Sequence, residues 1–260
     1  MAVRQDATSK TRVPDYWLAP ALLVVAGTGW WWSAVTARDM GSDTGMSSGM
    51  DMSGAMASMS LAAFLVAWVA MMGAMMLPAI LPVVRLYSRA AARGTVAPLV
   101  VFLVGYAAIW SAMGLPVFYI WTRLDQPLAD ATPTVGRIAG VVLVASAAYQ
   151  LSPFKAVCLR HCRSPLGFFM QHAKNLHRPT GALAMGARHG LYCLGCCWML
   201  MAVLVAFGTM QLAWMAGVAL LIFVEKVTPI GERVAAVAGV AFLSLGVVLL
   251  LHPATVGSLT

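Results

Sequence analysis

The chain has 260 residues, of which 61% are hydrophobic and only 10% are charged. A soluble globular domain is about 45–50% apolar and about 25% charged, so the composition excludes that class and predicts an all-α, polytopic membrane protein. The net charge of +8 would favour nucleic-acid binding in a soluble protein. Here the basic residues lie in short segments between apolar runs, where they set topology and contact anionic lipid. We therefore expect the lipid bilayer as a partner and no nucleic acid.

Seven apolar runs are each predicted to form a transmembrane helix, because about 20 mostly apolar residues cross a bilayer. The runs are roughly Leu18–Val35, Leu61–Leu81, Pro98–Trp121, Val135–Leu151, Ala187–Phe207, Gln211–Val224 and Val234–Leu251. The short linker at Gly208 and Thr209 predicts a hairpin turn, and the sixth run is short enough to be half a span. We expect one bundle, in which the first transmembrane helix over residues 18–35 precedes a helical membrane domain over residues 61–251.

The distribution of Lys and Arg predicts the orientation of the bundle. With the N-terminal segment, residues 1–17, in the cytoplasm, only Arg38, Arg123 and Arg137 among the basic residues fall on the outer side. The C-terminal tail, residues 252–260, then lies outside, as an odd number of spans requires. The first run is expected to be a retained anchor rather than a cleaved signal peptide, because it is long and acidic residues precede it.

The segment between the first two runs, residues 36–60, is predicted to be an outer loop rich in methionine. It contains the sequence DMGSDTGMSSGMDMSGAMASM, which cannot bury a core. Met50, Met52 and Met56 have short spacings that allow a flexible chain to fold around one ion. Thioethers are soft ligands that select Cu(I), so we predict metal capture. The alternative is a polar loop in which the methionines are incidental.

The second apolar run carries four methionines in the sequence MMGAMMLP. Met72 and Met76 are four residues apart and share one face of a helix, so both are candidate ligands. The alternative is packing, because methionine fills irregular gaps in cores.

The five cysteines form two clusters, unlike the even and dispersed set of a secreted disulfide framework. The first is CLRHC at residues 158–162, in an expected inner loop just after the fourth run, and the second is HGLYCLGCC, which begins at His189. On a helix, His189, Cys193 and Cys196 or Cys197 share one face.

Closely spaced cysteines that occur twice are typical of a metal site, in which four thiolates, or three and a histidine, bind copper or zinc. The candidate ligands are Cys158, His161, Cys162, His189, Cys193, Cys196 and Cys197. The alternatives are inert packing, which is common for buried cysteines, and, for the first cluster alone, loop residues at the membrane interface; the metal site is favoured over both.

Two ionisable residues end the sixth run. Glu225 is a candidate hydrogen-bond acceptor for a histidine ligand, because such acceptors orient metal-binding imidazoles. Lys226 is also a functional candidate, as ionisable residues in or near the membrane are, but extension of its ammonium group to the membrane surface is slightly favoured.

Four stretches resemble a known family. CLRHCRSPLGFF, GARHGLYCLGCCWMLM, VEKVTPIGERV and MMGAMMLPAILP resemble an uncharacterised bacterial family of predicted metal-binding integral membrane proteins, over about residues 60–250. The resemblance implies a multi-pass protein of the bacterial inner membrane with a metal site. The family often has a tryptophan beside a histidine in the long inner loop, where this chain has Leu176-His177-Arg178. The Met-rich outer loop is not part of the resemblance.

These observations together predict copper handling, meaning binding, uptake or delivery. The soft ligands form a series from the outer loop through Met72 and Met76 to the inner Cys/His group, and a partner metalloprotein or membrane complex would receive the ion. Two alternatives stay open: a membrane-bound metal-dependent oxidoreductase or a subunit of one, and a zinc-stapled structural subunit. The sequence has no nucleophile–base pair, phosphate loop or nucleotide motif, so a role without catalysis is favoured.

Overall fold

The computed structural model describes residues 15–42, 60–90, 97–129, 132–163, 178–207 and 212–253, and within these ranges all regular structure is helical. The helices are α1 (Asp15–Ser42), α3 (Leu61–Ala90), α4 (Ala97–Ala129), α5 (Thr132–Gln150), α6 (Pro153–Arg163), α8 (Pro179–Ala206), α9 (Leu212–Val227) and α10 (Gly231–Leu251). The all-α prediction is therefore confirmed. The Met-rich loop was expected over residues 36–60, but α1 continues to Ser42, so residues 36–42 are helical. Residues 43–59, with Met50, Met52 and Met56, lie outside the described residues.

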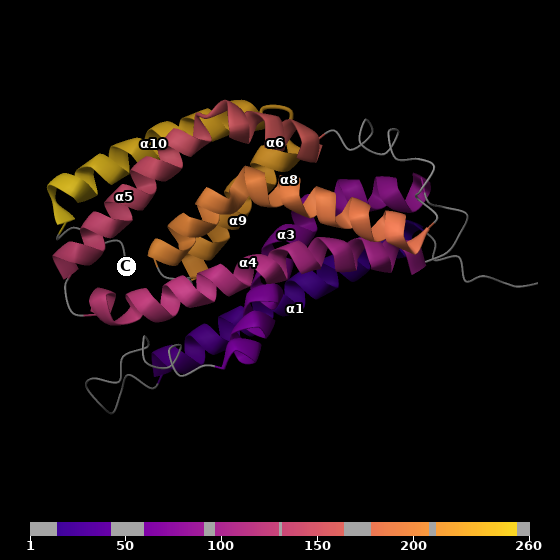
Figure 1. Ribbon diagram of the computed structural model, residues 1–260, viewed down its shortest axis with the longest axis horizontal. Coiled ribbons are helices and arrows are strands. Elements are labelled where there is room, and N and C mark those ends of the chain that lie inside the picture. Colours follow the sequence, from indigo (N-terminus) through magenta and orange to yellow (C-terminus); the bar gives the residue numbers. More distant parts are fainter. Residues whose placement is uncertain are drawn as a thin grey trace, which may run out of the picture.

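The helices pack mainly in pairs. α4 packs along α8, α5 runs beside α10, and α1 packs against α3 (Figure 1). α9 contacts α3, α8 and α10, and α6 packs on α8 and α9. The largest buried cluster draws its side chains from α3, α4, α6, α8 and α9, so the core lies among helices that are far apart in the sequence.

Fewer helices are both long and apolar enough to cross a membrane than the seven runs predict. Among the described residues, four helices are long and apolar enough: Leu61–Ser88, Pro98–Ile120, Pro179–Ala206 and Gly231–Leu251. A fifth is counted only if α5 and α6, which meet at a bend of 65°, form one broken span. α9 has 16 residues, which at about 1.5 Å per residue fall short of a hydrocarbon core of about 30 Å.

The segment after the fourth run is a helix, where the sequence analysis expected a loop. α5 ends at Gln150, and α6 begins at Pro153 after the two intervening residues Leu151 and Ser152. The Ser152 hydroxyl accepts a hydrogen bond from the Lys155 N–H at 3.3 Å, and proline is well suited to the first helical position. This local start signal makes α6 a separate helix, which turns Leu159 and Cys162 into the core.

Close packing brings α4 and α8 together. A Cβ atom on Gly186 of α8 would overlap the backbone of Phe102 on α4, so only glycine fits there. The contact holds α8 against α4 about two turns before Cys193, the first cysteine of α8.

Candidate metal centre

The cysteine-rich face of α8 points into the core. His189, Cys193, Cys196 and Cys197 are all at most 4% exposed. The Cys196 and Cys197 thiols donate hydrogen bonds to the Cys193 carbonyl oxygen, at 3.1 and 2.8 Å. The three- and four-residue spacing thus gathers three sulphur atoms within about one helical turn.

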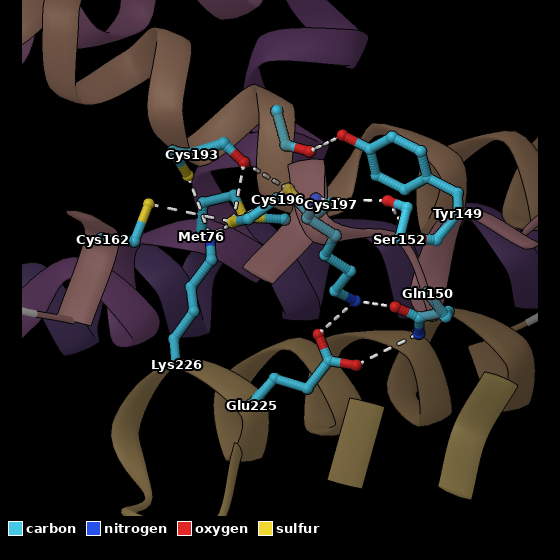
Figure 2. A network of polar contacts seen from close by, with 12 residues as sticks. Met76, Tyr149, Gln150, Ser152, Cys162, Cys193, Cys196, Cys197, Glu225 and Lys226 are labelled. Atoms are coloured by element: carbon cyan, nitrogen blue, oxygen red, sulfur yellow. Dashed lines mark hydrogen bonds and ion pairs between the residues drawn. The ribbon is translucent and has the colours of Figure 1, made fainter. Parts of the chain in front are cut away.

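A fourth cysteine joins them from α6. The sulphur of Cys162 lies 3.8 Å from the sulphur of Cys196, and Cys162 is 6% exposed (Figure 2). Two sulphurs that share one metal ion at about 2.3 Å each lie no more than about 4.6 Å apart, so the separation suits a shared ion. α6 can approach α8 closely because residue 195 is glycine, whose missing side chain leaves room for the Cys158 sulphur.

A buried ammonium group contacts these sulphurs from α9. Lys226 Nζ lies 2.9 Å from Cys193 Sγ, 4.0 Å from Cys197 Sγ and 3.7 Å from Met76 Sδ on α3 (Figure 2). The Tyr106 hydroxyl on α4 also hydrogen-bonds the Cys193 sulphur, at 3.0 Å. We call Met76, Cys162, Cys193, Cys196 and Cys197 the sulphur cluster.

A second buried charge network lies beside the sulphur cluster. Glu225 and Lys155 form an ion pair at 2.7 Å, and their side chains are 2% and 1% exposed. Gln150 donates to the other Glu225 oxygen at 3.1 Å and accepts from Lys155. Each charge is therefore compensated, which a buried ion requires. Glu225 thus bonds a lysine, where the sequence analysis expected it to orient a histidine ligand.

The two candidate histidines are placed differently. His189 is buried between the rings of Phe102 and Tyr106, with centroids 6.2 and 6.0 Å away. His161 is exposed, stacks on Tyr192 at 4.6 Å, and its Nδ1 lies 2.8 Å from the Val157 carbonyl oxygen of its own helix. Only His189 therefore lies within the core that holds the sulphur cluster.

The two remaining candidates differ in burial. Cys158 is half-buried against Gly195, and Met72 is 2% exposed in the same core as Met76. Sequence reasoning missed Lys226, because it placed the ammonium at the membrane surface, whereas the residue is 8% exposed. The signal available was an ionisable residue at the end of an apolar run.

The arrangement is a set of soft donors without a preformed metal geometry. Among the described residues, no three His, Cys, Asp or Glu side chains converge as a metal site would require. The thiols instead bond the Cys193 carbonyl oxygen and the Lys226 ammonium. Four thiols and a thioether nevertheless form a donor set that matches a soft ion such as Cu(I).

The fold and this cluster define a class: an all-helical protein, with helices apolar enough to cross a membrane, around a buried group of sulphur donors. The family model described as PpoB2, copper chaperone, matches residues 65–249, and the chain belongs to this copper chaperone family. The match begins within α3 and ends within α10, so it contains the whole sulphur cluster. No curated protein and no solved structure gives a significant match.

Proposed function

We propose that the protein is a membrane-embedded copper chaperone that holds Cu(I) at the sulphur cluster and passes it to a partner protein. The observation that carries the proposal is that sulphurs from α3, α6 and α8 lie in one buried region, where they are linked by the Cys162–Cys196 contact and by their contacts with Lys226. Thiolates and thioethers are soft ligands that select Cu(I). The family to which the chain belongs is described as a copper chaperone.

Cys162, Cys193, Cys196 and Cys197 are the proposed thiolate ligands, and Met76 is the proposed thioether ligand. His189 and Met72 lie in the same core and are proposed as neighbouring donors that the ion meets on entry or exit. Cys158 and His161 lie on the more exposed face of α6 and are proposed to take part in transfer to a partner rather than in storage.

The apolar exterior supports a place in a lipid bilayer. Val66, Val237 and Leu251 are 70–72% exposed on helices α3 and α10, which is costly in water and favourable in lipid. We propose a multi-pass protein of the bacterial inner membrane with residues 1–17 in the cytoplasm, because nearly all Lys and Arg then face inward. Residues 36–60 and 252–260 lie outside in this orientation.

The test is Cu(I) binding by the full-length protein in detergent, measured by competition with a chromogenic Cu(I) chelator. The wild type is expected to bind near-stoichiometric copper. Cys193→Ser and Cys162→Ser should each lose at least about tenfold in affinity, the lower end of what even indirect partners of a metal cost.

Cys158→Ser is the matched control for Cys162→Ser. Both cysteines are on α6, but Cys158 is half-buried and Cys162 faces Cys196. The control should bind copper within about threefold of the wild type, a change smaller than loss of an indirect metal partner produces. A folded wild type without affinity for Cu(I) would refute the proposal. Tightly bound zinc that does not exchange would instead support a structural zinc site, and turnover of a substrate would support an oxidoreductase.

A further inference from the structure

We propose that Lys226 is a tethered substitute for the copper ion: in the copper-free protein its ammonium fills the place among Cys193, Cys197 and Met76 that Cu(I) takes on loading, and its return promotes release. This inference rests on the proposed function and identifies the residue that determines how readily the cargo leaves.

The first argument is geometric. Lys226 Nζ is within 4.0 Å of three sulphur atoms that come from two helices other than its own. An ion bound to these sulphurs at about 2.3 Å each would lie in the volume that Nζ and its hydrogens fill. The ammonium and the copper ion therefore cannot occupy the place together.

The second argument concerns the partners of the ammonium. A buried ammonium needs acceptors or a counter-charge, and the adjacent carboxylate of Glu225 is already bonded to Lys155 and Gln150. The acceptors that the described part of the chain provides to Lys226 are sulphur atoms. The cluster thus already binds a monovalent cation, one that is attached to the chain.

The third argument is the charge balance of exchange. Cu(I) and an ammonium each carry one positive charge, so exchanging one for the other leaves the net charge at the sulphurs unchanged while their protonation stays the same. Each thiol that then binds the ion as a thiolate releases one proton to solvent. Lys226 is the penultimate residue of α9, and the next residue, Val227, is 41% exposed. The four-carbon side chain of Lys226 can therefore carry the displaced ammonium to the polar end of α9. A divalent ion would add a charge to the same buried place.

Competition of this kind weakens apparent affinity and accelerates release. If the ammonium fills the place in about nine of ten copper-free molecules, the apparent affinity is about tenfold below the intrinsic one. A protein that delivers its ion benefits from such a residue, because the ammonium compensates the sulphurs as the ion departs.

The experiment compares full-length wild type with Lys226→Leu, Lys226→Gln and Lys226→Arg in detergent. Affinity is measured by competition with a chromogenic Cu(I) chelator, and release by the rate of transfer to excess chelator. The two neutral variants should bind Cu(I) about tenfold more tightly and transfer it correspondingly more slowly. Lys226→Arg, which keeps the charge, should remain near the wild type. Circular dichroism and gel filtration report folding.

Lys226→Gln keeps an N–H donor for Cys193, so it carries the test if Lys226→Leu does not fold. Arg160→Gln is the control for a general loss of charge, because Arg160 is exposed and pairs with Glu232 at 3.1 Å; it should leave both measurements unchanged. Weaker binding in the neutral variants would show that Lys226 stabilises bound copper, and unchanged binding would show a structural role; either result overturns this inference alone. A wild type that binds no Cu(I) would remove the proposed function and this inference together.

Discussion

Met75 and Met76 are neighbours on α3 with different surroundings. Both are buried, at 2% and 1% exposure, and of the two it is the Met76 sulphur that contacts the Lys226 ammonium. Methionine is common as core packing, so the sequence MMGAMMLP could not separate a ligand from a space-filling side chain. The structure makes Met76 the candidate ligand of this pair.

We expect Met76→Leu to lower Cu(I) affinity by about tenfold and Met75→Leu to leave it unchanged. Leucine conserves most of the volume, so either change should cost less than about 1.5 kcal/mol of stability. The loss at residue 76 reflects the missing thioether, a soft ligand for Cu(I). Chelator competition on both variants is the measurement. Equal affinities would mean that Met76 only packs.

At the scale of elements, the buried charges fix where α6 and α9 lie. Lys155 on α6 bonds Glu225 on α9, and Gln150 at the end of α5 joins both. This network holds the bend between α5 and α6, and so places Cys162 opposite Cys196. Apolar contacts alone would not fix the position of α6 along α8 and α9, because they have no directional preference.

Lys155→Met is expected to destabilise the fold by about 3–5 kcal/mol, because it leaves the Glu225 carboxylate buried without its cation. The double variant Lys155→Met/Glu225→Met removes both charges and should recover most of that loss. Thermal unfolding in detergent, followed by circular dichroism, measures both. A double variant no more stable than the single one would show that the ion pair is not what the bend depends on.

At the scale of the whole molecule, the family match covers one part of the chain and leaves the N-terminal part outside it. Residues 65–249 contain the sulphur cluster, whereas α1 and the Met-rich segment at residues 36–60 precede the match. α1 packs on α3, but the cluster draws on α3, α6, α8 and α9. Equilibrium binding is therefore expected to depend on the matched unit.

Replacing Met50, Met52 and Met56 together by serine should leave the equilibrium affinity of the cluster unchanged. It should slow loading from dilute external Cu(I) into proteoliposomes by about tenfold, since tethered ligands raise the local concentration of ion. Stopped-flow loading and chelator competition on the same samples distinguish rate from affinity. A lower affinity would place these methionines among the ligands of the main site.

The sequence by itself determined the features that depend on local geometry. Composition indicated an all-α chain with apolar helices, and the helical repeat placed His189, Cys193 and Cys196 or Cys197 on one face, because three- and four-residue spacing is a property of any α-helix. The start of α6 is also encoded locally, in the capping residue Ser152 and in Pro153 at the first helical position, although a loop was expected there.

Only the tertiary structure decided which segments meet. Met76 and Lys226 are 150 positions apart, and Cys162 and Cys196 are 34 apart. Apolar helices of similar composition can pack in many orders, and the order here depends on close contacts such as Gly186 against Phe102 and on buried pairs such as Lys155 with Glu225. That packing buries the Lys226 ammonium among sulphurs. The sequence does not show which helices meet, so from sequence alone the ammonium was expected at the membrane surface.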